Sequence, residues 1–470
     1  MSEVTSKTSH YDAIILGSGQ AGNPFAVDLA AKGRRTAMIE RAAIGGTCVN
    51  YGCTPTKTMV ASAEVANLAR RGREYGIEVG KVSVDMTAVR ERKRGVVKKW
   101  REGSENRLQQ AKLVDVIYGE GSFLGPKQVR VRLNDGGERI LTSDLIVIDT
   151  GLTAGKPPLP GLEGVPFLDN MSIMELDVLP EHLLVLGGGY VGLEFGQMFR
   201  RFGSRVTVVQ RGKQLLTNED SDVADEIAKL LREDGIEILL ETTAESVAAS
   251  GNNIRLTIKV KGESKSKNVE GTHLLVATGR NPNTAKLNLQ AAGISTDEHG
   301  YIPVNDKLET TVPGIYAVGD VKGGPAFTHI SYDDYRVLKA NLLDGGNRTI
   351  TGRPLPYCVF IDPQLGRIGL TEKDARAQGK KVRVARLPMT SVARAVETGQ
   401  SRGFMKALVD PQTDEILGAA VLGMDGGEIM SMIQIAMMGK LKYPVLQSAI
   451  LAHPLLSESL NNLFLHFQDE

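Results

Sequence analysis

Two short apolar runs, at residues 13–16 and 183–186, each lead directly into a glycine-rich stretch. An uninterrupted apolar run of this length predicts a strand buried in a parallel sheet, and the segment that follows predicts a helix. Each run precedes a G-x-G-x-x-G pattern, formed by Gly17, Gly19 and Gly22 and again by Gly187, Gly189 and Gly192. The chain therefore predicts two strand–turn–helix units of the same design.

These two units repeat at one fixed offset. Gly17 recurs 170 positions later as Gly187, and the same offset carries Gly33 onto Gly203. A single G-x-G-x-x-G pattern is weak evidence, but two at one offset, each followed by a second strand, indicate the Rossmann turn. Its glycines allow a tight bend and a close approach of the backbone to a pyrophosphate at the helix N-terminus. We therefore expect two dinucleotide sites, one for a resident flavin and one for a nicotinamide nucleotide.

The end of each second strand indicates which nucleotide binds there. An acid at this place bonds the ribose hydroxyls, and the first unit supplies Glu40 in TAMIER. The second unit supplies Gln210 followed by Arg211 in VTVVQR. A missing carboxylate beside a cation favours a 2′-phosphate, so we expect NADPH in the second unit. NADH stays possible, because Arg41 occupies the matching place in the first unit.

The most basic stretch of the chain, residues 89–103, allows two interpretations. Val89, Val96, Val97 and Trp100 form an apolar stripe at roughly helical spacing, which is typical of a helix with a solvated face. The alternative is a landing patch for an anionic partner. We favour the solvated helix.

Composition narrows the class of protein. A length of 470 residues suits about three domains, and a net charge of +1 gives no reason to expect nucleic acid or an anionic membrane as partner. No apolar run approaches the ~18 residues of a membrane span, and the N-terminus lacks the apolar core of a signal peptide. We expect a cytoplasmic protein, in which two close cysteines are more typical of catalysis or metal binding than of a structural disulfide.

The stretch GGTCVNYGCTPTK, residues 45–57, holds two of the three cysteines, Cys48 and Cys53. It resembles the redox-active disulfide motif of the class I pyridine nucleotide-disulfide oxidoreductases, which include glutathione reductase, dihydrolipoamide dehydrogenase and mercuric reductase. Three further motifs of that family follow in the same order. They are LLVATGRNPN at 274–283, TTVPGIYAVGD at 310–320 and HPLLSE at 453–458.

The resemblance implies an α/β architecture of two Rossmann-like dinucleotide-binding domains and a C-terminal α+β dimerisation domain. The implied boundaries are 1–150 for the FAD-binding domain, 151–280 for the NAD(P)-binding domain, 281–350 for a central segment that completes the FAD site and 351–470 for the interface domain. It also implies a homodimer whose active site is shared between the subunits.

The resemblance also implies a path for the electrons, from NADPH through FAD to a Cys48–Cys53 disulfide. Positions five apart in a regular helix are too distant for such a bond, whose Cα atoms approach within about 6.8 Å, so Gly52 and Pro55 indicate a distorted helix. By resemblance, Cys53 contacts the flavin and Cys48 attacks the substrate. His453 of the other subunit serves as their acid–base partner.

The family motifs carry further roles onto individual residues. Glu458 orients His453, Lys57 and Glu194 form a buried pair beside the flavin, and Tyr190 is the gate that moves aside for nicotinamide. The implied cofactor-binding residues of the two nucleotide sites are, together, Gly17, Gly19, Gly22, Glu40, Gly46, Thr47, Lys57, Thr150, Gly151, Gly187, Gly189, Tyr190, Gly192, Glu194, Gln210, Arg211, Gly279, Arg280, Gly319, Asp320, Phe327 and Thr328. No resident metal is expected.

The electron acceptor stays open. Phe25 and Ala26 stand where glutathione reductases carry arginines, and Gln210 stands where dihydrolipoamide dehydrogenases usually carry an acid. The body of the chain most resembles mercuric reductase, yet its last residues, NNLFLHFQDE, contain no cysteine pair. We favour an NADPH-dependent reductase of a disulfide or other thiol-reactive acceptor. The alternatives are reduction of a soft metal ion at Cys48 and Cys53, a dihydrolipoamide dehydrogenase, and a flavin-bound redox sensor.

Overall fold

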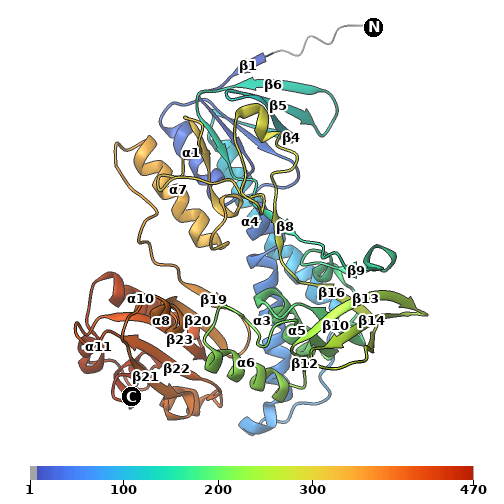
Figure 1. Ribbon diagram of the computed structural model, residues 1–470, viewed down its shortest axis with the longest axis vertical. Coiled ribbons are helices and arrows are strands. Elements are labelled where there is room, and N and C mark those ends of the chain that lie inside the picture. Colours follow the sequence, from blue (N-terminus) through green and yellow to red (C-terminus); the bar gives the residue numbers. More distant parts are fainter. Residues whose placement is uncertain (1–7, 469–470) are drawn as a thin grey trace. The chain divides into compact units, whose positions relative to one another are not determined.

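The computed structural model describes residues 8–468 and divides into two compact units (Figure 1). The first unit comprises Met1–Thr58, Glu91–Gly155 and Gly279–Arg353. The second comprises Met59–Arg90, Lys156–Thr278 and Pro354–Glu470. Each unit is therefore built from three separate stretches of the chain.

The first unit is built on an eight-stranded sheet in the order β1-β6-β5-β4-β3-β2-β7-β18. From β4 to β18 the neighbouring strands are parallel, whereas β4, β5 and β6 pair antiparallel. The strands are β1 Thr8–His10, β2 Ala13–Leu16, β3 Thr36–Glu40, β4 Val114–Gly125, β5 Gln128–Leu133, β6 Glu138–Thr142, β7 Ile146–Ile148 and β18 Ile315–Ala317. A separate antiparallel pair joins β8 Leu152–Ala154 to β17 Arg280–Pro282.

Helices cover this sheet, and α1 and α7, far apart in sequence, lie side by side (Figure 1). The helices that contribute residues to the first unit are α1 Gly22–Ala31, α2 Gly46–Asn50, α3 Cys53–Arg70, α4 Met86–Gln110 and α7 Thr328–Leu342. Short 3-10 turns are η4 Leu289–Ala292 and η5 Gly319–Lys322. The helices α3 and α4 also contain residues of the second unit.

The apolar run at 13–16 forms β2 because both faces of this strand are buried. Ile15 packs into the apolar cluster that contains Phe25 of α1, whereas Ile14 and Leu16 pack into a second cluster with Phe123. Successive strand residues point to opposite faces of a sheet, so a strand covered on both sides has no polar position. Each such fully buried Ile or Leu contributes about 1.5–3 kcal/mol.

The second unit contains three sheets. A parallel sheet has the order β12-β11-β10-β16-β9, a three-stranded antiparallel sheet has the order β13-β14-β15, and a five-stranded antiparallel sheet has the order β19-β20-β23-β22-β21. The strands are β9 Phe167–Leu168, β10 His182–Leu186, β11 Arg205–Val209, β12 Glu237–Leu239, β13 Thr242–Ser250, β14 Asn253–Val260, β15 Lys267–Gly271, β16 His273–Val276, β19 Tyr357–Val359, β20 Gln364–Gly369, β21 Arg383–Pro388, β22 Phe404–Val409 and β23 Ile416–Gly423.

The helices of the second unit pack on these sheets. They are α5 Tyr190–Phe202, α6 Ser221–Glu233, α8 Glu372–Ala377, α9 Ala393–Glu397, α10 Gly426–Met438, α11 Tyr443–Ser448 and α12 Ser459–Leu463. The 3-10 turns are η1 Gly72–Tyr75, η2 Leu162–Gly164, η3 Ser172–Glu175, η6 Met389–Ser391 and η7 Leu456–Glu458. In β10, Val185 packs with Phe195 of α5, while Leu184 packs on the other face with Leu256 of β14.

The predicted mixed α/β class is confirmed, and the repeat appears as two matching units, β2–α1–β3 and β10–α5–β11. The basic stretch at 89–103 lies within α4, as predicted. One detail of that prediction was wrong, because Val97 is buried but Trp100 is 59% exposed, so the apolar stripe is narrower than expected. Among the described residues, no helix is both long and apolar enough to span a membrane.

Candidate functional site

The first glycine turn accepts only glycine at Gly17. This residue has a φ of +103°, and a Cβ on it would lie 2.2 Å from the carbonyl oxygen of Asp149. Its amide donates to the carbonyl of Ile39 in β3 across 2.8 Å. The turn therefore packs against the carboxyl ends of β3 and β7, which is where the pyrophosphate of a dinucleotide binds in Rossmann folds.

Asp149 holds this turn, and our sequence analysis did not identify it. Its Oδ2 accepts a hydrogen bond from the amide of Gly22 across 2.7 Å. Burial raises the pKa of the Asp149 carboxyl well above its ordinary value, against the opposing effect of the Gly22 amide. The only signal in the sequence was its position, directly after the apolar strand β7 and before Thr150.

Glu40 ends β3 with its carboxylate held by backbone and side-chain donors. Its Oε2 accepts from the Ser18 amide (3.1 Å) and the Ser18 hydroxyl (2.6 Å), and its Oε1 accepts from the Ala42 amide (2.8 Å). Close by, Thr150 Oγ1 is buried and has no hydrogen-bond partner among the residues the structure describes. A glycine cradle, a fixed acid and an unsatisfied buried hydroxyl fit the ribose and pyrophosphate of FAD.

Cys48 and Cys53 lie on two helices rather than on one. The helix α2 ends at Asn50, Tyr51 follows with the non-helical angles φ −141° and ψ 8°, and α3 begins at Cys53. The helix is thus interrupted at Gly52, as its sequence indicated. The structure holds the two cysteines as thiols.

Both sulfurs lie within hydrogen-bonding reach of Thr328, the first residue of α7. Cys53 Sγ lies 3.3 Å from Thr328 Oγ1. The pKa of the Cys48 thiol is raised by its hydrogen bond with Cys53 and by burial, while the Thr328 hydroxyl and the Lys57 ammonium act in the opposite direction. Attack by Cys48 on an acceptor therefore calls for a base, because only the thiolate is a nucleophile.

Asn50, between the two cysteines, ties their loop together and was not identified from the sequence. Its buried amide group donates to the carbonyls of Ile44 (3.0 Å) and Gly46 (2.9 Å). Its Oδ1 accepts from Arg101 Nε of α4 across 2.7 Å. These bonds connect the loop after β3 to the helix that carries Cys48.

The TTVPGIYAVGD motif ends beside Arg280. Arg280 lies 3.4 Å from Asp320. Burial raises the pKa of the Asp320 carboxyl above its ordinary value, and the Arg280 guanidinium only partly opposes this shift. The amide of Gly319 donates to Asp334 Oδ2 across 2.8 Å. The first unit also contains the predicted cofactor-binding residues Gly46, Thr47, Gly151, Gly279 and Phe327.

The second glycine turn repeats the design of the first. Gly187 has a φ of +117°, and a Cβ on it would lie 2.4 Å from the carbonyl oxygen of Ala277. Its amide donates to Val209 of β11 across 3.0 Å. Gly189 precedes α5, whose first residue is the half-buried Tyr190, and Gly192 lies in its first turn.

Gln210, directly after β11, uses its side chain locally. Its Oε1 accepts from the Gly188 amide (3.3 Å), and its Nε2 donates to the Gln214 carbonyl (3.1 Å). Arg211 beside it is exposed. This end of β11 thus presents an amide and a cation where the first unit presents Glu40.

The remaining predicted residues occupy separate places. Glu194 is buried on α5 and accepts from the Phe360 amide across 2.9 Å. Lys57 lies in the first unit on α3, and its predicted pairing with Glu194 stays a prediction. His453 is exposed, and its Nδ1 lies 2.9 Å from Glu458 Oε2. This distance allows Glu458 to orient the imidazole.

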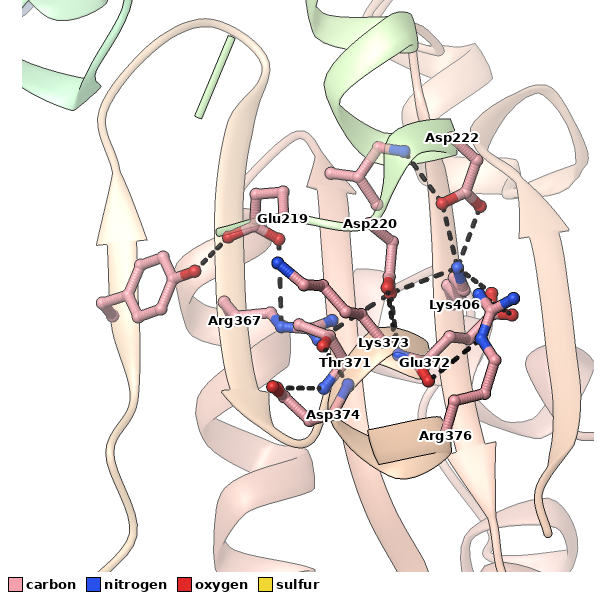
Figure 2. A network of polar contacts seen from close by, with 12 residues as sticks. Glu219, Asp220, Asp222, Arg367, Thr371, Glu372, Lys373, Asp374, Arg376 and Lys406 are labelled. Atoms are coloured by element: carbon pink, nitrogen blue, oxygen red, sulfur yellow. Dashed lines mark hydrogen bonds and ion pairs between the residues drawn. The ribbon is translucent and has the colours of Figure 1, made fainter. Parts of the chain in front are cut away.

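One group of three acids among the described residues lies close enough to hold a metal ion: Asp220, Asp222 and Glu372. Figure 2 shows Lys406 in the middle of this group. Its Nζ lies 3.3 Å from Asp220 and 2.9 Å from Asp222, and it also pairs with Glu372. Because an ammonium already supplies the positive charge, we interpret the group as an ion-pair network.

Comparison with known families matches most of the chain. A model described as pyridine nucleotide-disulphide oxidoreductase matches residues 11–334, and a model of that family's dimerisation domain matches residues 355–464.

Several curated relatives match over nearly the whole chain. The probable pyridine nucleotide-disulfide oxidoreductase RclA of Escherichia coli K12 is 38% identical over 97% of this chain and 98% of its own length. A mercuric reductase of Staphylococcus aureus is 33% identical, covering 98% of this chain and 83% of the relative. A dihydrolipoyl dehydrogenase of Chlamydia pneumoniae is 31% identical, covering 96% and 95%.

The fold also matches solved structures. A Cu(II) complex of the HOCl-induced flavoprotein disulfide reductase RclA from Escherichia coli superimposes with a TM-score of 0.89 at 38% identity, covering 97% of this chain and 99% of that chain. The same protein described without Cu(II) gives a TM-score of 0.87.

Proposed function

The chain belongs to the pyridine nucleotide-disulphide oxidoreductase family, whose members use FAD and NAD(P)H, and we propose that it passes electrons from NADPH to a disulfide or other thiol-reactive acceptor at Cys48 and Cys53. The observation that carries this proposal is the grouping of both thiols with Thr328 in the unit that contains the first glycine turn. A protein of this family is an NAD(P)H-dependent oxidoreductase, so the proposal concerns the path to the acceptor and the acceptor itself.

The residues of the first unit fit a role in holding FAD. Gly17, Gly19 and Gly22 would receive its pyrophosphate, Glu40 would bind its adenosine ribose and Asp320 would bind its ribityl chain. When bound, FAD supplies two-electron chemistry between a nicotinamide and a disulfide. Thr150 Oγ1 offers one further donor to the group.

The two cysteines divide the work with a disulfide acceptor. The Cys48 thiolate attacks one sulfur of the acceptor, which releases the first product thiol and leaves a mixed disulfide. Cys53 then attacks Cys48, which releases the second thiol and closes a Cys48–Cys53 disulfide. The position of Cys53 at the first residue of α3 supports its role as thiolate, because a helix N-terminus stabilises negative charge.

The raised pKa of Cys48 supports a separate base for its proton. We assign this role to His453 of the other subunit in a homodimer, in agreement with the match of residues 355–464 to a dimerisation domain. The Nδ1 contact with Glu458 leaves Nε2 to take the proton from Cys48 and to return it to the leaving thiolate. The cycle needs a reducing compartment such as the cytoplasm, where free thiols persist.

NADPH is the proposed electron donor. Gln210 and the exposed Arg211 stand at the end of β11, where an acid would repel a 2′-phosphate. Lys213, also exposed, adds a second cation to the same loop and was not identified from the sequence.

A soft metal ion is the second candidate acceptor. Two cysteine sulfurs are the ligands that soft metals prefer, and relatives include mercuric reductases and an RclA structure described as a Cu(II) complex. A dihydrolipoamide dehydrogenase is disfavoured because Gln210 stands where those enzymes usually carry an acid. A flavin-bound redox sensor is disfavoured because the second glycine turn is complete.

Steady-state oxidation of NADPH by the purified protein tests the proposal. The acceptors are lipoamide, oxidised glutathione, other small disulfides, Hg(II), Cu(II), quinones and oxygen, each measured with the unaltered protein and with Cys48→Ser. We expect at least one disulfide or thiophilic acceptor to raise the rate above that with oxygen, and Cys48→Ser to remove the gain. If no acceptor exceeds oxygen, the enzymatic proposal fails and the redox sensor becomes the better interpretation.

A further inference from the structure

The segment from Gln210 to Asp220, which we call the nucleotide loop, connects β11 to α6. It begins where the adenosine ribose of a dinucleotide lies in Rossmann folds. It ends in a run of acids that enters the ion-pair network of Figure 2. The loop therefore joins a nucleotide-binding position to residues that follow it by well over a hundred positions in sequence.

The near end of the loop is attached to the second glycine turn. The Gly188 amide donates to Gln210 Oε1, and the Gly188 carbonyl accepts from the Leu216 amide across 3.0 Å. Leu215 is fully buried, and a Cβ on Gly188 would lie 2.7 Å from its side chain. The shape of the loop and the shape of the glycine turn are thus coupled by direct contact.

Two side chains in series connect the two ends of the loop. Gln210 Nε2 donates to the backbone carbonyl of Gln214 (3.1 Å), and the side-chain amide of Gln214 donates to the backbone carbonyl of Glu219 (3.0 Å). Arg211 and Lys213 extend from the same segment into solvent. Their position relative to a bound nucleotide depends on how firmly the loop is held.

The far end of the loop is held by residues of the C-terminal sheet. Glu219, 4% exposed, accepts from the Tyr357 hydroxyl and lies 3.8 Å from Arg367 Nε. Asp220, 6% exposed, accepts from the amides of Glu372 (3.2 Å) and Lys373 (3.3 Å) at the start of α8. Figure 2 shows these contacts converging on the last two residues of the loop.

Lys406 of β22 is the centre of this anchor. Its side chain is 2% exposed and pairs with Asp220, Asp222 and Glu372. Burial opposes its charge, but the hydrogen bonds to Glu372 and Asp222 outweigh burial and raise the pKa of the ammonium. Removing this buried cation would leave its acids uncompensated. Their mutual repulsion would then act on the end of the loop, because Asp220 is one of these acids.

We propose that Lys406 and Arg367 are positioning residues for nicotinamide nucleotide binding, which act by anchoring the nucleotide loop so that Arg211 and Lys213 meet the adenosine phosphate. This inference rests on the proposed function, in which the second glycine turn binds the electron donor. The C-terminal part of the chain thereby contributes to nucleotide affinity without touching the nucleotide.

Direct binding to the oxidised holoenzyme tests this inference. NADP⁺ and NAD⁺ are titrated by calorimetry into the unaltered protein, Lys406→Met, Lys406→Arg and Gln214→Met. Circular dichroism and the FAD content of each variant report whether it is folded. We expect Lys406→Met and Gln214→Met to weaken the preferred nucleotide about tenfold, within the range of network mutations that touch neither ligand. Lys406→Arg should retain most of the nucleotide affinity of the unaltered protein. In steady-state assays, Lys406→Met and Gln214→Met should change the KM for the nicotinamide nucleotide more than kcat.

Arg402→Met is the matched control. Arg402, 35% exposed, also forms an ion pair with Asp234 (2.7 Å) and donates to the Leu230 carbonyl (2.8 Å), but at the other end of α6. It should leave nucleotide affinity unchanged. An equal loss in Arg402→Met and Lys406→Met would indicate general loosening and overturn the inference.

Unchanged affinity in folded Lys406→Met would also overturn the inference, whatever the result for Gln214→Met. If Lys406→Met does not fold, unchanged affinity in Gln214→Met overturns the inference, because the Gln214 side chain joins the loop to Glu219. The test is separate from the question of the acceptor. Failure of every acceptor would leave the binding result intact, and a preference for NAD⁺ would refute only the proposed choice of NADPH. An unaltered protein that binds neither nucleotide would overturn both proposals.

Discussion

Replacing Gly17 with alanine should remove FAD from the protein, because two separate effects meet at this residue. Gly17 has a φ of +103°, which disfavours any side chain, and a Cβ would lie 2.2 Å from the Asp149 carbonyl oxygen and 2.8 Å from its carbon. Neither atom belongs to a flexible side chain, so the end of β7 or the turn itself would have to move. Both lie at the position proposed for the FAD pyrophosphate.

The free-energy cost of Gly17→Ala follows from comparison with Gly33, which lies at the end of the same strand–turn–helix segment. Gly33 has a φ of +78°, but a Cβ there would meet nothing within 4 Å. Gly33→Ala therefore carries only the backbone strain of about 1–2 kcal/mol. Gly17→Ala adds the cost of forcing an extra carbon into packed structure, about 1–3 kcal/mol. The total of about 2–5 kcal/mol corresponds to a loss of FAD affinity of about 30-fold or more.

The assay compares both variants with the unaltered protein. The ratio of flavin to protein absorbance after gel filtration gives the FAD content, and titration of the apoprotein with FAD gives the affinity. Release of flavin fluorescence on heating gives the temperature at which each site opens. We expect Gly33→Ala to keep its FAD and Gly17→Ala to lose it. A Gly17→Ala protein with the same FAD affinity as Gly33→Ala would refute the argument that the contact with Asp149 shapes this site.

Three further predictions concern the chemistry. Cys53→Ser should abolish the long-wavelength absorption band expected of a thiolate against flavin in the two-electron-reduced protein, whereas Cys48→Ser should keep it; a band that survives only in Cys53→Ser would show that the two sulfurs are assigned in reverse. Arg211→Ala should raise KM for NADPH about tenfold or more and leave KM for NADH unchanged, since a charged hydrogen bond contributes about 1.5–3 kcal/mol. If the substitution changes neither the KM for NADPH nor the KM for NADH, the preference for NADPH has no basis. The pKa of the Cys48 thiol is raised, so its thiolate is scarce at neutral pH and becomes more abundant as the pH rises. His453→Gln should therefore slow disulfide reduction about 10²–10⁴-fold at neutral pH and recover activity at alkaline pH. A pH-rate profile with no alkaline recovery would contradict the role of His453 as base for Cys48.

Local patterns carried most of what could be predicted. The two glycine turns, the strands before them and the interruption between Cys48 and Cys53 all depend on residues within a few positions of one another. An apolar run long enough to be covered on both faces predicts β2 and β10, and a glycine with positive φ marks the bend that follows. The helix over the basic stretch was predicted from another local pattern, an apolar stripe at helical spacing, but that pattern did not predict the exposure of Trp100.

Residues that act through distant partners were missed. Asp149 is an ordinary acid after a strand until the fold brings it to the Gly22 amide, 127 positions away. Asn50 is an ordinary amide until Arg101 reaches it from α4. In the sequence nothing distinguishes Lys406 from any other lysine in a strand, yet it is buried among acids that precede it by up to 186 positions. None of these pairs leaves a periodic or spacing signal.

The sequence by itself determined that this protein has two dinucleotide turns and a close pair of cysteines, because backbone conformation at glycine and the burial of an apolar strand are properties of short segments. The tertiary structure alone decided which acid holds the first turn, that Thr328 meets the cysteines, and that the nucleotide loop ends in a buried ion-pair network. Such contacts depend on the packing of strands and helices from remote parts of the chain, where burial makes each unpaired charge costly. Only the folded chain brings those charges together.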